Sequence, residues 1–378
     1  MMLLSLASKQ IWPHVLTSAR LKPERVFLLH SENPNESQGP AQRLKRFFDE
    51  TGLVPPGGTR LELVPHDDFT GMERALDALQ TKHQLPLADC CLNFTGGNKL
   101  MATAGFRWAA RRGVSAFYLE RGNQLTWFEP RDGEMHTRSE PMDGHLADEF
   151  DPLSLLRCQL EASEVERDGE ILALNRTGLD TPLKELARLL ANGDDPLKFL
   201  VRAAAVSTVD VKGDCLEFTT AVLLLKCGVN GVRRSVRLKV QPNHGGKLSP
   251  PHAEIDLLFN RGGRLWLVDC KDRRPAENLI DGLWPFIQPR AKVPGSQASR
   301  LIGRIGTELG MSQTKVLKED LLAIREIGGL LGRALCVRRD RLPVEVEQYA
   351  RLNAITLIYC DALAIELPRI LSRSVPEK

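Results

Sequence analysis

Three chemically active side chains flank a glycine turn in the segment AEIDLLFNRGGRLWLVDCK: Asp256, Asp269 and Lys271. Two carboxylates held a few ångströms apart repel each other unless a divalent cation lies between them, and oxygen ligands of this kind suit Mg²⁺ or Mn²⁺. Such a cation lowers the pKa of a bound water and stabilises charge that builds up on a phosphate. A lysine two residues after the second acid would point into the same site, where it can orient water or balance phosphoryl charge. The residue types therefore predict metal-dependent hydrolysis of a phosphate ester.

A β-hairpin that turns at NRGG, residues 260–263, would bring these side chains together. A four-residue loop sets Glu254 opposite Asp269. The same register sets Asp256 opposite Leu267. Because side chains alternate along a strand, the acids and the lysine then share one face, whereas a loop with an odd number of residues would break this parity. The other face is a consistent apolar layer: Ile255, Leu257, Phe259, Trp266, Val268 and Cys270.

The pattern Asp-x12-Asp-x-Lys on a hairpin, after an acidic helix, resembles the PD-(D/E)xK restriction-endonuclease-like superfamily. The resemblance makes Asp256 the first metal ligand, and Asp269 and Lys271 the (D/E)xK pair, with Asp where Glu is commoner. Glu217, in the helix expected around GDCLEFTTAVLLLKCG, matches the glutamate that many members place near the metal, so the implied metal ligands are Asp256, Asp269 and Glu217. For Glu217 an exposed helix glutamate is the alternative. For LVDCK taken alone, the alternative to a catalytic motif is an ordinary strand that ends in charged residues.

A second segment, NFTGGNKLM, follows an apolar run and opens a helix-like run. The backbone amides of such a turn and the helix N-terminus favour an anion. Thr95 supplies a hydroxyl, Gly96 and Gly97 let a ligand approach the backbone, and Lys99 supplies charge. The spacing is neither GxGxxG nor a P-loop, which argues against ordinary NAD or ATP binding. A tight glycine turn without a ligand is the alternative.

The pattern N-x-T-G-G-x-K-x-M after a strand is similar to the ligand motif of CARF domains, the CRISPR-associated Rossmann fold. The SKQ of LASKQIWPHVL resembles the matching first-strand turn of one CARF group, which fuses the domain to a PD-(D/E)xK nuclease in a chain of about this length. That family consists of ancillary effectors of type III CRISPR immunity. The resemblance implies a homodimer that binds a cyclic oligoadenylate, commonly the tetra-adenylate, and then cuts DNA, in some members RNA, without sequence specificity. The implied ligand pocket is lined by Ser8, Lys9, Gln10, Thr95, Gly96, Gly97, Asn98 and Lys99. Asn98 departs from the threonine that is usual in this motif, which leaves open the ring size of the cyclic oligoadenylate and the affinity for it.

The elements around these motifs predict an α/β fold. Residues 1–140 alternate strand-like and helix-like runs, the signature of a parallel sheet with crossover helices, and are assigned to an N-terminal Rossmann-like CARF domain. Its last segment, SAFYLERGNQLTWFEP, predicts a hairpin that adds an antiparallel edge. Residues 141–200 are interpreted as a helical connector with one convincing helix, in GLDTPLKELARLLANGDDP. Residues 201–378 are assigned to a C-terminal PD-(D/E)xK nuclease domain.

Charge is divided unevenly along the chain. Residues 201–378 hold 28 Lys+Arg against 19 Asp+Glu, a balance of +9, and residues 1–200 hold 23 against 29, a balance of −6. A polyanion would therefore be attracted mainly to the second half. The strand VRRSVRLKV carries four candidates for nucleic-acid phosphate contacts, with a solvated strand face as the alternative: Arg233, Arg234, Arg237 and Lys239.

Composition indicates a globular protein without a membrane span, because no apolar run reaches the roughly 18 residues that a span requires. The eight cysteines show no CxxC spacing, which suits reduced thiols in a cytoplasm. Two other functions stay open. One is a non-catalytic CARF-type sensor whose second domain only holds nucleic acid, and the other is an unregulated repair or restriction endonuclease whose first domain is scaffold.

Overall fold

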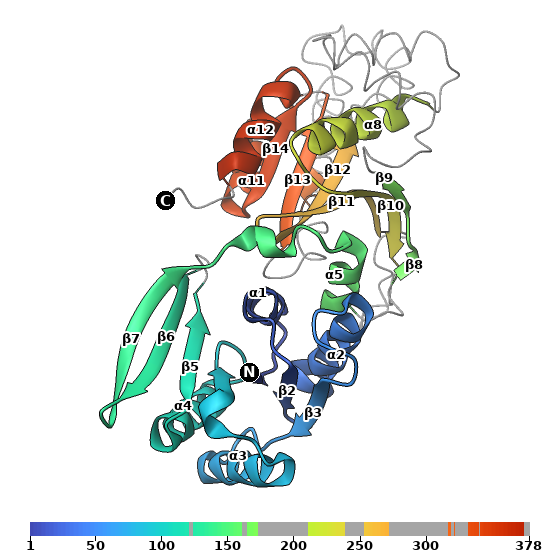
Figure 1. The fold of residues 1–378 in the computed structure, drawn as a ribbon. Coiled ribbons are helices and arrows are strands. Elements are labelled where there is room, and N and C mark those ends of the chain that lie inside the picture. Colours follow the sequence, from blue (N-terminus) through green and yellow to red (C-terminus); the bar gives the residue numbers. More distant parts are fainter. Residues whose placement is uncertain are drawn as a thin grey trace, which may run out of the picture. The chain divides into compact units, whose positions relative to one another are not determined.

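The structure of the 378-residue chain is a computed structural model, and it divides into two compact units (Figure 1). Unit 1 comprises Met1–Glu166, Phe259–Leu265 and Arg373–Lys378, and unit 2 comprises Arg167–Leu258 and Trp266–Ser372. The residues that the structure describes are 1–120, 124–160, 165–172, 211–238, 253–271, 317–318, 321, 332–339 and 341–373. Among them, no helix is both long and apolar enough to cross a bilayer.

The first sheet has seven strands in the order β3-β2-β1-β4-β5-β6-β7. Strands β1 to β5 pair in parallel and β6 and β7 continue as antiparallel strands, so the predicted Rossmann-like sheet with an antiparallel edge is confirmed. The strands are β1 Met2–Leu6, β2 Arg25–His30, β3 Thr59–Leu63, β4 Cys90–Asn93, β5 Ser115–Leu119, β6 Gln124–Arg131 and β7 Glu134–Pro141.

Helices cover both faces of this sheet (Figure 1). Helices α3 and α4 pack on the face that carries Leu4, Leu6 and Leu92, whereas α1 and α2 lie on the opposite face. The alternation of side chains along β1 explains why Ser5, between two buried leucines, meets α1 instead. The helical segments are α1 Trp12–Leu21, η1 Pro34–Gln38, α2 Gly39–Thr51, α3 Phe69–His83, η2 Leu87–Asp89, α4 Lys99–Arg112, η3 Gly144–Ala147 and α5 Pro152–Gln159.

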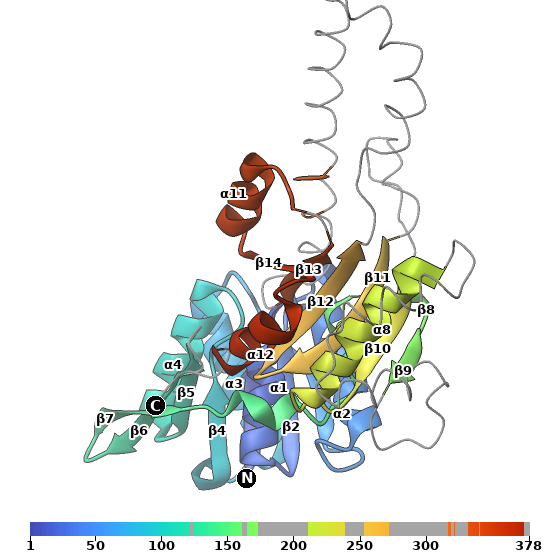
Figure 2. The ribbon, with the colours of Figure 1, turned by 90° about the horizontal axis from the view of Figure 1, so that it is seen from above.

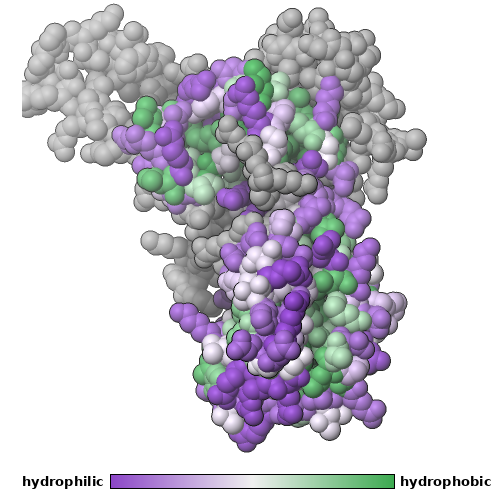
Figure 3. All heavy atoms as spheres, turned by 60° about the vertical axis from the view of Figure 1, so that its left-hand side comes forward, coloured by the Kyte–Doolittle hydropathy of each residue, from purple (hydrophilic) through white to green (hydrophobic). Residues whose placement is uncertain are grey.

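Strand β7 was not predicted from the sequence. Its residues, EMHTRSEP, are almost all exposed or half-exposed, so they lack the apolar alternation by which a strand is recognised. Figure 3 turns this side of unit 1 forward and shows mainly hydrophilic side chains there, with hydrophobic ones gathered along one side. The strand is held by its pairing with β6 and by an ion pair to that strand, Arg138–Glu129 at 3.3 Å.

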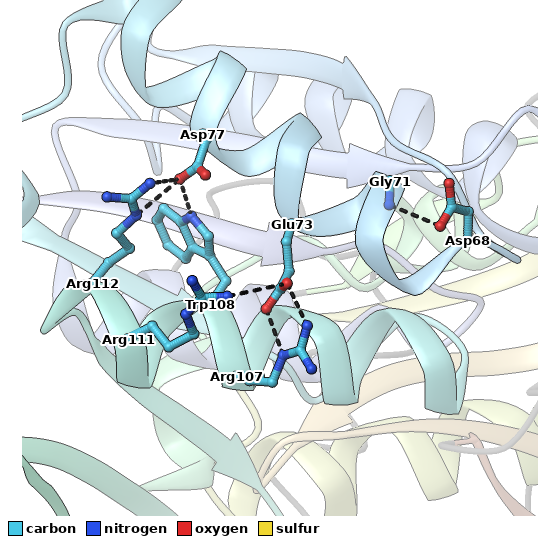
Figure 4. A network of polar contacts seen from close by, with 8 residues as sticks. All are labelled: Asp68, Gly71, Glu73, Asp77, Arg107, Trp108, Arg111 and Arg112. Carbon is cyan, nitrogen blue, oxygen red and sulfur yellow. Dashed lines mark hydrogen bonds and ion pairs between the residues drawn. The ribbon is translucent and has the colours of Figure 1, made fainter.

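A polar network joins α3 to α4 (Figure 4). Glu73 accepts hydrogen bonds from the Arg107 guanidinium at 2.7 and 2.6 Å, and these bonds hold the pKa of Glu73 below its usual value. Asp77 accepts from the buried Trp108 indole at 2.7 Å and from Arg112 at 3.0 Å. The helices are thus fixed to each other by polar contacts.

Replacing Asp77 by Ala is expected to destabilise the protein by about 1–3 kcal/mol, because the buried Trp108 N–H would lose its acceptor. Chemical denaturation measures this change. Asp49→Ala, which removes a surface pair with Lys45, is the matched control and should cost about 0.5 kcal/mol or less. Equal losses in the two variants would contradict the assigned role of Asp77.

The second sheet has the order β14-β13-β12-β11-β10-β8, with β9 also paired to β10. Helix α8 lies on one face and α11 on the other (Figure 2). Contacts agree with this view: Cys270 of β12 approaches Thr220 of α8, and Cys336 of β13 packs with Val346 of α11. The elements are β8 Val165–Arg167, β9 Glu170–Leu172, α8 Val211–Lys226, β10 Val232–Leu238, β11 Ala253–Arg261, β12 Arg264–Lys271, β13 Gly332–Arg338, α11 Val344–Leu352, β14 Ile355–Tyr359 and α12 Leu363–Arg373.

The segment interpreted as a connector, 141–200, contains more than helix. It supplies η3 and α5, and then the short strands β8 and β9 of the second sheet, which the sequence did not predict. Strands of three residues are too short to show a period. The helix expected in GLDTPLKELARLLANGDDP lies outside the described residues, and the first unit continues to Glu166.

Candidate active site and candidate ligand loop

The hairpin β11–β12 turns through two glycines. Gly262 and Gly263 have φ of 60° and 71°, and the strands continue to Arg261 on one side and Arg264 on the other. Two successive residues with positive φ make the type of tight turn whose twist matches that of paired strands, and glycine adopts it without strain. The turn is therefore shorter than the four-residue loop expected from NRGG.

The shorter turn corrects the predicted register by two residues. Counted back from the turn, Asp256 lies opposite Asp269 instead of Leu267, and Glu254 lies opposite Lys271. Because the loop still has an even number of residues, the two acids and the lysine stay on one face of the hairpin. The corrected register places the two aspartates closer together than the sequence predicted.

Asp256, Asp269 and Lys271 form one charged cluster. The Lys271 Nζ lies 2.6 Å from Asp269 Oδ1, and the Cys270 N–H donates to Asp256 Oδ2 at 2.6 Å. Burial, followed by the charge of Asp269, raises the pKa of Asp256 to about 7. Burial alone would lower the pKa of the Lys271 ammonium, but the charges of Asp269 and Asp256 outweigh it and raise that pKa. A cluster of this kind is typical of functional sites.

A fourth side chain, Cys336 of β13, joins this cluster. Its Sγ lies 3.5 Å from Asp269 Oδ2, as donor to that carboxylate. Burial and then the charge of Asp269 raise the pKa of the Cys336 thiol, so it remains protonated and able to donate. Cys336 was not predicted, because it lies 67 residues from Asp269 in the chain and only the pairing of strands brings the two together.

The oxygen atoms of Asp256 and Asp269 suit a hard cation. Mg²⁺ is held by one or two carboxylates and keeps several waters, so this pair fits such an ion. Among the described residues there is no group of three or more His, Cys, Asp or Glu side chains that could hold a metal. Glu217 lies on α8, where its carboxylate is 3.6 Å from the Arg234 Nε.

The basic residues of β10 are distributed over two faces. The Arg234 guanidinium lies 4.2 Å from the Phe218 ring of α8. Arg237 is exposed and lies 3.5 Å from Glu254, so it is on the side of the charged cluster. Arg233 is half-buried, and Lys239 lies outside the described residues.

The metal-free protein is expected to lose the stabilisation that Asp256 provides as the pH rises from about 4 to about 7. The folded state keeps the Asp256 proton up to a pKa of about 7, whereas the unfolded chain releases it near 3.8. Melting temperatures in EDTA between pH 4 and pH 8 measure this effect. Asp256→Asn should melt a few degrees above the wild type at pH 8 and close to it at pH 4. Parallel curves for the two proteins would contradict the raised pKa.

The two loops expected to bind a ligand lie side by side at the C-terminal ends of the central strands β1 and β4. Strands β1 and β4 are parallel neighbours with Ser5 opposite Asn93, so the loops that follow them meet. A Cβ on Gly96 would lie 1.9 Å from the Leu6 carbonyl oxygen and 3.1 Å from Ser8 Oγ. Only a glycine therefore permits this close approach of the two loops.

Side chains fix the second loop in place. Thr95 Oγ1 accepts from the Leu119 N–H at 2.9 Å, and the Thr95 N–H donates to Asn93 Oδ1 at 3.0 Å. Asn98 caps helix α4: its Oδ1 accepts from the Met101 N–H at 2.8 Å. Asparagine and threonine are both good N-caps, so the cap itself does not require a threonine at position 98.

The remaining loop residues lie at the same strand ends. Gly97 has φ of 72°, Lys99 is exposed at the first residue of α4, and Ser8 Oγ accepts from the Gln10 N–H at 3.3 Å. Lys9 is exposed. A helix N-terminus beside glycine amides and two lysines is an arrangement that favours an anion.

No protein-family profile and no curated protein matches the sequence. Solved structures do match the fold. Can2 from Sulfobacillus thermosulfidooxidans, in complex with cyclic tetra-adenylate, superposes with a TM-score of 0.59 at 15% identity, over 97% of this chain and 96% of that one. VC1899 from Vibrio cholerae superposes with a TM-score of 0.63 at 13% identity, over 100% and 99%.

A third structure is a type III CRISPR defence DNA nuclease activated by cyclic oligoadenylate. It superposes with a TM-score of 0.51 at 18% identity, and 95% of this chain matches 48% of that one. The predicted α/β fold class, with a Rossmann-like sheet followed by a second α/β sheet, is confirmed. Over nearly its whole length, the chain has the fold of Can2 and VC1899.

Proposed function

We propose that the protein is a metal-dependent, sequence-nonspecific nuclease that a cyclic oligoadenylate switches on, and that it acts as a homodimer in the cytoplasm in type III CRISPR defence. The observation that carries the proposal is the pair Asp256–Asp269 with Lys271 on one face of a hairpin. A hairpin that only packed in a core would gain little from two buried, mutually repelling carboxylates.

The two aspartates and the lysine of this cluster have different tasks in the proposed reaction. Asp256 and Asp269 hold Mg²⁺ or Mn²⁺. Glu217, which the sequence suggested as a third ligand, lies on α8 beside Arg234 and does not form a group of three with these acids among the described residues, so it is not assigned to the ion. The ion, when bound, lowers the pKa of a water and stabilises charge on the phosphodiester. Lys271 keeps its ammonium charged at every physiological pH, since its pKa is raised, and that charge is available to a phosphoryl oxygen or to the attacking water.

The activator is proposed to be cyclic tetra-adenylate, and its proposed site is the loop pair that contains Thr95, Gly96 and Lys99. Support comes from the loop geometry and from Can2, whose structure holds this ligand on the same fold. A ligand shifts a conformational equilibrium only by binding one state more tightly than the other. A ring with two-fold symmetry could do so by engaging both subunits of a dimer.

A plasmid assay tests the proposal. Supercoiled DNA and a labelled RNA are incubated with the protein and Mn²⁺, with and without cyclic tetra-adenylate, and parallel reactions contain EDTA. Cutting that requires both the metal and the ligand is the expected result. Cutting without the ligand would favour an unregulated nuclease, and binding without cutting would favour a sensor; either outcome would refute the proposal.

A further inference from the structure

The turn of the hairpin β11–β12 is held residue by residue by the segment that follows the first sheet, Gly144–Asp148. The Asn260 side-chain amide donates to the Ala147 carbonyl, and the Gly262 N–H donates to Asp148 Oδ1 at 2.8 Å. A Cβ on Gly263 would lie 3.2 Å from the Gly144 Cα, so the two backbones touch there. This is why Phe259–Leu265 belongs to unit 1, although the strands on either side of it belong to unit 2.

Asp148 is the centre of this contact. Its side chain is buried and accepts from three groups: the Gly262 N–H, His145 Nδ1 at 2.6 Å and the Arg261 guanidinium at 3.4 Å. Burial raises the pKa of this carboxyl despite these donors. A buried carboxylate is costly unless its hydrogen bonds are made. The position of the turn is therefore fixed relative to the segment Gly144–Asp148.

The same segment contacts the helix that follows the first candidate ligand loop. Helix α1 begins two residues after Gln10 and packs against η3, and its Leu16 side chain would lie 3.3 Å from a Cβ on Gly263. Ser5 Oγ and His14 Nδ1 are 2.8 Å apart, which ties β1 to α1 across the loop. A displacement of the loop would therefore be passed to α1 and to η3 as packed, rigid bodies.

From the turn, two hydrogen-bonded strands lead to the charged cluster. Asp256 is five residues before Arg261 and Asp269 is five residues after Arg264, which corresponds to about 17 Å of strand on each side. A paired two-stranded ladder moves as one body, so a displacement of the turn also displaces both aspartates.

We propose that Asp148 is a positioning residue that couples occupancy of the candidate ligand loops to the position of the hairpin that carries Asp256 and Asp269. The coupling rests on the proposed function, since it needs both a ligand and a nuclease. In this proposal, η3 and the glycine turn transmit ligand binding to the carboxylate pair. Neither of the two sequence motifs indicates this role.

Asp148→Ala and Asp148→Asn test the coupling. Two quantities are measured: the dissociation constant for cyclic tetra-adenylate, by calorimetry, and the ratio of plasmid cutting with the ligand to cutting without it. In Asp148→Ala the ratio should fall at least tenfold towards one, while ligand binding persists. Asp148→Asn keeps an oxygen acceptor for the Gly262 N–H and should restore part of the ratio.

Asp77→Ala is the matched control, because it also removes a carboxylate with several donors in unit 1, at a distance along the chain from both loops and from η3. It should lower stability and leave the ratio unchanged. An Asp148→Ala protein that the ligand stimulates as strongly as the wild type would overturn the coupling.

Hydrogen exchange separates the coupling from nuclease activity. Addition of cyclic tetra-adenylate should change the exchange of the amides of residues 261–264 in the wild type and not in Asp148→Ala; unchanged exchange in the wild type would overturn the coupling. A wild type that binds the ligand, shows this change and does not cut would support the coupling and refute the proposed nuclease. A wild type that does not bind the ligand would overturn both.

Discussion

Asp269→Asn is expected to lower plasmid cutting at least about 100-fold and to leave cyclic tetra-adenylate binding intact. The carboxylate is proposed to hold the cation and also receives the Lys271 ammonium and the Cys336 thiol, so its replacement disturbs three interactions at once. Loss of a residue that only supports a metal ligand already costs about 10–100-fold, and loss of the ligand itself should cost more.

Single-turnover cutting and calorimetry measure the two properties of this variant. The matched control is Asp361→Asn, which removes an exposed carboxylate paired with Arg341 and should keep full activity. Cutting by Asp269→Asn at the rate of the wild type would refute the assignment of the hairpin as the active site. Loss of cutting and ligand binding together would show that the sites are not separable.

Gly96→Ala is expected to have the converse effect and to weaken ligand binding by about 5- to 150-fold. The new Cβ would lie 1.9 Å from the Leu6 carbonyl oxygen, and backbone atoms cannot move aside as a flexible side chain can. Overpacking of this kind costs about 1–3 kcal/mol, and 1.4 kcal/mol corresponds to a factor of ten in affinity. Cutting that depends on the ligand should fall with the affinity.

Calorimetry measures the ligand affinity of the Gly96 variant, and thermal melting measures its stability. Gly231→Ala, at a position where an added Cβ meets nothing within 4 Å, is the control and should change neither property. A Gly96→Ala protein with a lowered melting temperature but undiminished affinity would place the ligand away from this loop.

Much of the fold followed from the sequence because the central strands are buried on both faces. The centres of such runs, for example VFLL at residues 26–29, are apolar on both faces of the strand, and each run is followed by a helix-like run, which leaves few arrangements besides a parallel sheet. The edge strand β7 and the short strand β9 lack such a signal, since an exposed or very short strand has no apolar face.

The sequence predicted the content of the charged cluster but not its geometry. Parity along the strands placed Asp256, Asp269 and Lys271 on one face, whereas the register depended on whether Asn260 and Arg261 belong to the turn or to the strand. Residue types alone do not decide this, because Asn260 is also held by a hydrogen bond to the Ala147 carbonyl, in a segment 113 residues away. Contacts between segments more than 60 residues apart leave no trace in a single sequence, and the Cys336–Asp269 contact is of this kind.

The two-glycine turn also decides which insertions and deletions the hairpin can survive. Loss or gain of one residue there would rotate every later side chain of β12 by half a turn, so that Trp266, Val268 and Cys270 would face outward from α8. A gain of two residues would leave every side chain on the same face of the hairpin. It would change only the pairing register, so that Asp256 would no longer lie opposite Asp269. For this reason natural length variation at the tip should come in even steps.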